Sequence, residues 1–382
     1  MHIAFITSEY PHCKVKSAAG IGTSIKNLSE ELVKLEVQIS IFIYGQDCNE
    51  VFYENGINYH LISDKNYVFG RWYFYRKYIN DYIDAQVKLD NIDIIEAADW
   101  TGITAFMKFE IPLVIRFHGS DTYFCHLENR KQKFKNYFFE KKAVQNADAL
   151  VAPTKFAGDL SRKLFNVCQK NYLMIHHGIN LEIFHNANPD SFEQGTLIYV
   201  GSIIRKKGVL EIPKIFSLVR KQIPNVKLIV IGADCPDLAT GQESTWNLMQ
   251  SLFSLEDIKS VSYLGLMPYN KVQDYLINAN VCIFPSFAET FGMVTIEAMA
   301  LQKAVINSNI GWAHELMENG SSGYLVDPTN HLLYAKKIAQ ILEDKSRTAI
   351  LGKNARDFIL AKFDIKNIAK ENLAFYERIV AQ

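Results

Sequence analysis

The sequence predicts an α/β protein built from two doubly wound domains in series. Short runs of β-branched and aromatic residues alternate with amphipathic segments of helical period, and most runs are apolar throughout. Such runs are typical of parallel strands covered by helices on both faces. The alternation stops in a polar, irregular stretch at 180–195 and then begins again. At 382 residues the chain is long enough for two cores.

The elements follow in order along the chain. The first domain opens with an expected strand at 2–7 (HIAFIT) and a helix within 22–35 (GTSIKNLSEELVKL). Its further strands are expected at 38–44, 92–98, 113–119, 148–153 and 172–178. The second domain has expected strands at 196–202, 226–233, 260–265, 280–286, 303–308 and 323–328. Together they predict two sheets.

The end of the chain predicts one more helix. Ala369, Leu373, Tyr376 and Val380 recur at the spacing of one helix face. We therefore divide the chain into a first domain at 1–185, a second domain at 186–365, and a helix at 366–382 that could pack back on the first domain.

Composition narrows the class of protein. Lysine plus arginine equals aspartate plus glutamate at 41 each, which argues against a dedicated nucleic-acid binder. The six cysteines form no C-x-x-C pair, as expected for reduced thiols in a cytoplasmic protein. The opening MHIAFITSEYPHCK is too short in its apolar part for a signal peptide, and no run approaches a membrane span. We expect a cytoplasmic protein.

The most informative stretch is FAETFGMVTIEAMA, where seven mostly apolar residues separate Glu289 from Glu297. A carboxylate in such a setting needs a partner. Beyond Gly292 the pattern predicts a helix, whose first amides lack internal partners and favour anions or sugar hydroxyls. Helix capping by Glu289 and an ordinary ion pair for Glu297 are the alternative.

Three other stretches could carry chemistry at the carboxyl ends of strands. GSIIRKKG places Arg205, Lys206 and Lys207 where cations suit a diphosphate, although a solvated basic turn would look the same. In AAGIGTS, Gly20 and Gly22 allow close backbone approach, with Thr23 or Ser24 to cap the next helix, or serve turn geometry alone.

The third of these stretches is RFHGSD, in which His118 could donate a hydrogen bond to a substrate. A structural role for a lone histidine is the alternative. The two histidines of HHGIN, at 176 and 177, lack nearby acidic or cysteine ligands and are interpreted as a domain hinge rather than a metal site.

Taken together, these motifs with APTKF, VIGAD and GSSGYLVDP resemble, in order and spacing, the retaining nucleotide-sugar glycosyltransferases of family 4, which have the GT-B fold. The resemblance covers almost the whole chain. It implies two Rossmann-like domains facing a cleft, with acceptor binding on the first domain and nucleotide-sugar binding on the second. Where many members carry arginine after the strand glycine, this chain has Ser202, and Arg205 is the candidate for the missing charge.

The resemblance also implies roles for single residues. Glu289 would reach the hydroxyls of the transferred sugar, Glu297 the ribose hydroxyls, and Lys207 the diphosphate. His118 would reach in from the first domain. The remaining donor-binding positions it implies are Gly20, Arg205, Lys206, Phe291, Gly292 and Met293. With Glu289, His118 and Lys207 as the catalytic residues, no metal site and no cofactor beyond the donor are expected.

The resulting interpretation is a retaining, metal-independent glycosyltransferase acting on a glycan or lipid-linked acceptor, in bacterial surface polysaccharide synthesis. A nucleotide-sugar epimerase and a catalytically silent interaction subunit are the alternatives. The aromatic and basic stretches VFGRWYFYRKY and ENRKQKFKNYFFEKK could contact a membrane or a lipid-linked acceptor, or could be ordinary helices with a solvated basic face.

Overall fold

Residues 1–382 are described by a computed structural model, in which the chain divides into two α/β units. Unit 1 comprises Met1–Asn180 and Phe363–Gln382, and unit 2 comprises Leu181–Lys362. The chain therefore leaves unit 1 after residue 180 rather than after 185. The outgoing and returning segments pair here, because the Ile179 amide donates to the Phe363 carbonyl at 2.8 Å and the Ile365 amide donates to the Ile179 carbonyl at 3.1 Å.

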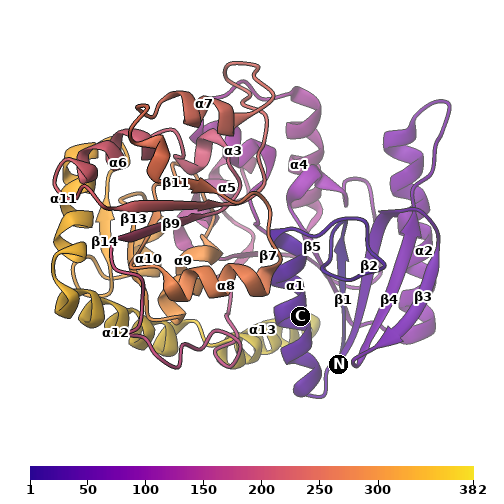
Figure 1. The fold of residues 1–382 in the computed structure, drawn as a ribbon. Helices are drawn as coiled ribbons and strands as arrows, with labels where there is room; N and C mark the ends of the chain where they lie inside the picture. The colour runs from indigo at the N-terminus through magenta and orange to yellow at the C-terminus, as the bar shows by residue number, and fades with distance from the viewer. The chain divides into compact units, whose positions relative to one another are not determined.

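Unit 1 is built on an eight-stranded sheet in the order β3-β4-β2-β1-β5-β6-β7-β8 (Figure 1). Its elements are β1 (His2–Thr7), α1 (Gly20–Lys34), β2 (Gln38–Gln46), β3 (Glu50–Glu54), β4 (Ile57–Ser63), α2 (Arg71–Asp90), β5 (Ile94–Ala98), η1 (Trp100–Gly102), β6 (Leu113–Arg116), α3 (Asp121–Leu127), α4 (Phe134–Asn146), β7 (Ala149–Ala152), α5 (Lys155–Phe165), β8 (Asn171–Met174) and α13 (Ile365–Val380). The strands predicted for this domain are confirmed.

Unit 2 is built on a six-stranded sheet, parallel throughout, in the order β11-β10-β9-β12-β13-β14. Its elements are β9 (Thr196–Val200), η2 (Arg205–Lys207), α6 (Ile212–Arg220), β10 (Lys227–Ile231), α7 (Thr245–Ser251), η3 (Ile258–Ser260), β11 (Val261–Tyr263), α8 (Tyr269–Asn278), β12 (Val281–Phe284), α9 (Met293–Ala300), β13 (Ala304–Ser308), α10 (Ala313–Leu316), β14 (Tyr324–Val326), α11 (His331–Leu342) and α12 (Lys345–Lys362). The doubly wound α/β prediction is confirmed for both halves of the chain.

The prediction of a purely parallel sheet is wrong at one edge of unit 1. Strand β3 pairs with β4 in the antiparallel direction. The two strands are joined at Asn55 and Gly56, which have φ values of +52° and +83°. Consecutive residues with positive φ match the twist of a tight hairpin, and Asn-Gly is its strongest sequence signal. The sequence contains this signal at Asn55 and Gly56, in ENGIN.

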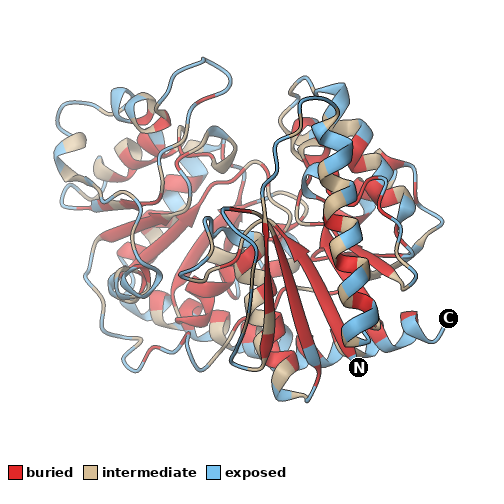
Figure 2. Cartoon of the chain, turned by 90° about the vertical axis from the view of Figure 1, so that its right-hand side faces the viewer, coloured by how far each residue is buried: buried red, intermediate tan, exposed pale blue.

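The central strands of unit 1 are buried because both faces of the sheet carry a core (Figure 2). Ile3 and Phe5 of β1 point to one face, where they pack with residues of α1 and α13. Ala4 and Ile6 point to the other face, where they pack with residues of α2 and α5. Alternate side chains of a strand therefore enter two different cores, which explains the continuous apolar run at 2–7.

A buried polar cluster fastens the end of the chain to the sheet of unit 1. Arg116 of β6 forms a bidentate ion pair with Glu96 of β5 at 2.7 and 2.9 Å. The Arg116 guanidinium also donates to the Asn372 amide oxygen at 2.5 Å, and the Tyr376 hydroxyl donates to Glu96 at 2.7 Å. Burial lowers the pKa of Arg116, but the Glu96 carboxylate outweighs burial and raises it above its ordinary value.

We expect Glu96→Gln to lower the free energy of unfolding by about 3 to 5 kcal/mol, because it leaves the Arg116 guanidinium buried without its counter-charge. Tyr376→Phe removes only one hydroxyl and should cost about 1 kcal/mol. Urea unfolding measures both. The control is Asp81→Asn in the exposed Lys77–Asp81 pair, which should barely move the midpoint. Equal shifts for Glu96→Gln and Asp81→Asn would contradict the structural role of the cluster.

Candidate donor site and a histidine cluster

The basic turn and the glutamate loop lie side by side in unit 2. After β9 the chain turns through η2 to Gly208, which has a φ of +69°. A Cβ atom at Gly208 would lie 1.8 Å from the Pro285 carbonyl oxygen, so only glycine fits. The backbone amide of Phe287 then donates to the Lys206 carbonyl at 2.8 Å. Two motifs far apart in sequence are therefore joined by backbone contacts.

This packing brings Lys207 to Glu289. The Lys207 ammonium forms an ion pair with Oε1 of Glu289, and the Ser286 hydroxyl donates to the same oxygen at 3.1 Å. The two side chains are 26% and 15% exposed, so the pair is partly shielded from water but still accessible. An ammonium held in this position could contact a diphosphate, and a carboxylate beside it could contact sugar hydroxyls.

Helix α9 begins directly after this loop. Gly292 is its N-cap residue with a φ of +99°, and no side chain caps the helix. Phe291 is buried beside the cap, which fixes the chain direction into the helix. The amides of Met293 and the next residue are therefore the first amides of the helix. They lie at its positive end, where an anion or a sugar hydroxyl is favoured. This is the position expected from the sequence.

Glu297 differs from Glu289 in its surroundings. It lies in the second turn of α9, is buried, and accepts a hydrogen bond of 2.5 Å from the hydroxyl of Tyr269. Burial raises the pKa of Glu297 to about 7, and the hydrogen bond from Tyr269 opposes part of that rise. The carboxyl group consequently titrates near neutral pH, and no cation neutralises it as Lys207 neutralises Glu289.

Arg205 points to a different partner. Its guanidinium forms a bidentate ion pair with Asp237 at 2.8 and 2.7 Å, and Asp237 also accepts from the amide and hydroxyl of Thr240. The hydrogen bonds from Arg205 hold the pKa of Asp237 below its ordinary range. Arg205 thus fastens the loop after β10. Its contact with a diphosphate, and that of Lys206, stay predictions.

In unit 1, His118 lies in a loop shaped by Asp99. The buried Asp99 carboxylate accepts from the backbone amides of His118 at 2.8 Å and Ser120 at 3.0 Å. Burial raises the pKa of Asp99 to about 7. The His118 ring stacks on the ring of His177 with centroids 5.2 Å apart, and Ser24 contacts Nδ1 of His177 at 2.9 Å. Burial lowers the pKa of His118 to about 3, so its imidazole is neutral.

The glycine-rich loop before α1 is organised differently from the expectation. A Cβ atom at Gly22 would lie 2.6 Å from the Glu9 carbonyl oxygen, whereas one at Gly20 would meet nothing within 4 Å. Gly22 is therefore the glycine that packing requires. The expectation that Thr23 or Ser24 caps the helix is wrong, because α1 already begins at Gly20 and the Glu9 side chain accepts from the Gly22 amide at 3.0 Å.

Several residues of these sites were missed by sequence reasoning. They are Glu9, Asp99, His177, Asp237 and Tyr269. Asp99 and Asp237 each follow a predicted strand, a position that could have flagged them. His177 was interpreted only as part of a hinge. Glu9 and Tyr269 carry no local signal, since each acts through a residue distant in sequence.

Both halves of the chain match models of known protein families. The model for glycosyl transferases group 1 matches residues 182–358, and the model for Glycosyltransferase Family 4 matches residues 18–183. The chain is a family 4-like glycosyltransferase. Its two units, with mostly parallel sheets, have the GT-B fold.

Curated relatives of this glycosyltransferase align over part of their length. It is 31% identical over 201 residues to the capsular polysaccharide biosynthesis glycosyltransferase CapM of Staphylococcus aureus, covering 53% of this chain and 50% of CapM. It is 24% identical over 251 residues to an uncharacterized glycosyltransferase of Methanocaldococcus jannaschii, covering 66% of this chain and 64% of that protein. The chain thus spans about half to two thirds of these relatives.

Solved structures share the fold over the whole chain. Sucrose-phosphate synthase of Thermosynechococcus elongatus superposes with a TM-score of 0.80 at 21% identity, covering 100% of this chain and 99% of that one. The Anabaena protein HepE in complex with UDP-glucose superposes with a TM-score of 0.72 at 17% identity, covering 99% and 100%.

Two further observations describe the glycosyltransferase as a whole. None of its helices combines the length and the apolar character needed to cross a lipid bilayer. No three histidine, cysteine, aspartate or glutamate side chains come together as a group that could hold a metal ion.

We expect Gly208→Ala to destabilise the glycosyltransferase more than Gly265→Ala. The two glycines have φ values of +69° and +68°, so alanine carries the same backbone strain at both. Only at Gly208 does the new methyl group meet a carbonyl oxygen, since nothing lies within 4 Å at Gly265. Urea unfolding should show a difference of about 1 to 3 kcal/mol between the variants. Identical midpoints would show that the turn is not packed against Pro285.

Proposed function

We propose that this glycosyltransferase is retaining and metal-independent, and that it moves a sugar from a nucleotide-sugar donor to a glycan or lipid-linked acceptor. The observation that carries the proposal is the Lys207–Glu289 pair beside the uncapped start of α9. A cation and a helix N-terminus suit the diphosphate of a nucleotide sugar, and a carboxylate suits the hydroxyls of the sugar. The complexes of HepE with UDP and UDP-glucose support this class of donor.

Lys207 would act on the leaving group. When the bond between the anomeric carbon and the diphosphate breaks, the diphosphate keeps the electron pair and gains negative charge. Once the donor has displaced Glu289 from Lys207, the ammonium and the first amides of α9 would lie beside the diphosphate and stabilise this charge as it develops. Glu289, beside Lys207, would accept hydrogen bonds from the hydroxyls of the transferred sugar.

The remaining residues would position the substrates. Glu297 would accept hydrogen bonds from the ribose hydroxyls of the donor. His118 is neutral, so it can donate one hydrogen bond to a sugar hydroxyl without placing a second charge near the anomeric centre. Gly20 opens α1 with no side chain in the way of a phosphate.

A role in surface polysaccharide synthesis is the biological setting we propose, with the enzyme on the cytoplasmic side of the membrane. The support is the relationship to CapM, whose name assigns it to capsular polysaccharide biosynthesis. An acceptor carried on a lipid would be consistent with that setting. A thermal-shift screen of nucleotide sugars identifies the donor, and turnover of that donor tests the activity.

We expect activity to survive excess EDTA, because Lys207 and the amides of α9 supply the positive charge that a divalent ion would otherwise provide. The measurement is the rate of donor turnover before and after chelation, with magnesium and manganese added back. The rate should stay within about twofold throughout. Loss of activity that either ion restores would refute metal independence.

The two glutamates should have different kinetic roles. Glu289→Gln should lower kcat by about 10- to 100-fold with a smaller change in donor KM, because a charged hydrogen bond near the reacting centre is lost. Glu297→Gln should mainly raise donor KM. Since the pKa of Glu297 is about 7, the wild-type donor KM should fall as pH rises from 6 to 8, when the carboxylate ionises.

The pH profile provides the control for Glu297. The Glu297→Gln variant should show a flatter profile, because an amide does not titrate in this range. Circular dichroism establishes that both variants are folded. Equal kinetic profiles for the two variants would favour the alternative in which these carboxylates only cap and pair within unit 2.

A further inference from the structure

An exposed strip of aromatic side chains crosses one face of unit 1. It consists of Trp72, Tyr73, Phe74, Phe106, Phe134 and Phe138, on α2, the segment after η1, and α4. Their rings form a continuous series, with centroids 5.7 Å apart for Trp72 and Phe106, 6.0 Å for Phe106 and Phe138, and 6.2 Å for Phe138 and Phe134. Single exposed aromatics are ordinary on a protein surface, but a contiguous series of them marks an interaction site.

The core does not account for this strip. Helix α2 buries Ile79, Ile83 and Val87, which repeat at the spacing of one helix face. The aromatic residues of its first turn come before that repeat and remain exposed. In the segment that leads into α2, Phe69 is 84% exposed, and at the start of α4 Phe134 is 78% exposed. These side chains contribute little to folding in their present positions.

The same face is strongly basic, although the chain as a whole is neutral. Residues 65–78 contain four lysines and arginines and no acidic residue, and residues 130–142 contain six and only Glu140. Glu140 is buried and accepts from the first amides of α3. Ion pairs in the second segment involve Arg130, whereas the exposed Lys131, Lys133 and Lys142 make none. In the first segment Arg71 pairs with Asp64 and Lys77 pairs with Asp81. The uncompensated positive charge of the face therefore comes mainly from the second segment.

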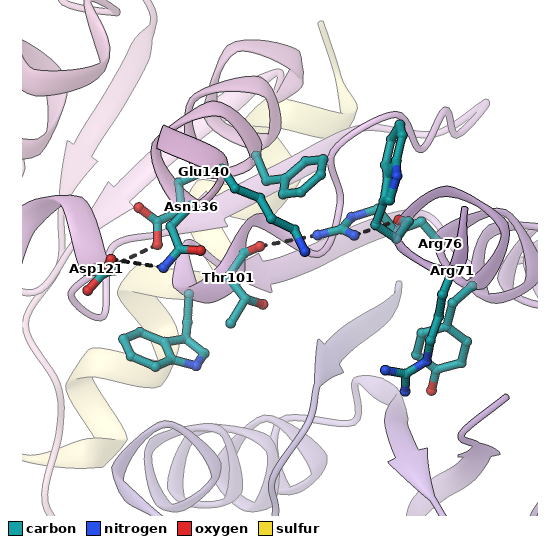
Figure 3. A pocket seen from close by; sticks show the side chains of 11 residues that line it. Arg71, Arg76, Thr101, Asp121, Asn136 and Glu140 are labelled. Atoms are coloured by element: carbon teal, nitrogen blue, oxygen red, sulfur yellow. Dashed lines mark hydrogen bonds between the residues drawn. The ribbon is translucent and has the colours of Figure 1, made fainter. Parts of the chain in front are cut away.

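A pocket of about 500 Å³ opens between α2 and α4 beside the strip (Figure 3). Arg76 lies at its wall, with its guanidinium donating to the carbonyl oxygens of Trp72 at 2.6 Å, Thr101 at 3.3 Å and Gly102 at 3.2 Å. It also stacks on Phe139 at 4.4 Å. These partners fix the guanidinium without neutralising it, because none of them is a carboxylate. Lys135 lines the same pocket, and so do the carboxylates of Asp121 and Glu140. Asp121 is paired with Arg130, and Glu140 accepts from the first amides of α3.

We propose that this face of unit 1 docks on an anionic lipid bilayer. The aromatic rings would lie at the level of the headgroups, where amphipathic rings are favoured, and the lysines would attract the anionic surface. The pocket beside them would receive a headgroup phosphate on Arg76 and Lys135. Docking of this kind is peripheral and needs no membrane-spanning helix. It does not depend on the proposed function, because it uses none of the residues assigned to the donor.

Flotation of the full-length protein with vesicles tests the proposal. The probes are vesicles of phosphatidylcholine alone and of phosphatidylcholine with one third phosphatidylglycerol. We expect binding to the anionic vesicles, weaker binding to the neutral ones, and a decrease with added salt. A protein that fails to float with anionic vesicles at low salt would refute the proposal.

Charge-reversal variants assign the binding to this face. The triple variant Lys131→Glu/Lys133→Glu/Lys142→Glu should lose at least about 100-fold in affinity, at about fivefold for each cation removed. The matched control Lys214→Glu/Lys221→Glu/Lys353→Glu changes three exposed lysines of unit 2 by the same charge and should retain binding within about threefold of wild type if only this face contacts lipid. Equal losses in the two variants would show non-specific attraction and contradict the assignment.

The aromatic contribution has a separate test. Phe69→Ser/Phe134→Ser alters two highly exposed side chains, so the melting temperature should not change. At high salt, where the rings supply most of the affinity, this variant should bind vesicles more weakly than the wild type does. Donor turnover in solution should be the same as in the wild type, which separates this proposal from that for the donor site. Self-association that these changes abolish, with no lipid binding, would instead make the strip an interface between two copies of the chain.

Discussion

The close contact between Gly208 and the Pro285 carbonyl is the constraint on which the donor site depends. It presses the basic turn after β9 against the loop after β12, and the backbone bond from Phe287 to the Lys206 carbonyl fixes their register. The strands β9 and β12 are neighbours in the sheet, so their carboxyl ends deliver these two loops to the same edge. The Lys207–Glu289 pair follows from that geometry rather than from any local preference of either segment.

Glu289 and Glu297 lie in opposite electrostatic surroundings. Glu289 is paired with a cation at the partly exposed end of the loop. Glu297 is buried against the Tyr269 hydroxyl, and burial raises its pKa toward neutrality. A cation-paired carboxylate stays charged and can exchange its partner for a ligand. A buried carboxylate without a cation is stabilised most by hydroxyl groups that donate hydrogen bonds to it. We therefore assign Glu289 and Glu297 to different parts of the donor.

Sequence reasoning reached the fold because continuous apolar strands and amphipathic helices are local signals. It also found the turn at 205–208 and the start of α9, since glycine, charge and helix period mark both. It missed what depends on distant partners. The capping of α1 by Glu9 and the shaping of the His118 loop by Asp99 arise only after folding. The buried Arg116 cluster joins residues more than 250 positions apart, and no periodicity reveals such a pair.

The most direct test of the donor site is a structure of the protein with its nucleotide sugar bound. The account predicts that the diphosphate lies at about 2.7 to 3.2 Å from Lys207 Nζ and from the first amides of α9. Glu289 should then have left Lys207 and accept hydrogen bonds from the sugar, while Glu297 contacts the ribose. A donor bound away from η2 and α9, with the Lys207–Glu289 pair unchanged, would contradict the account.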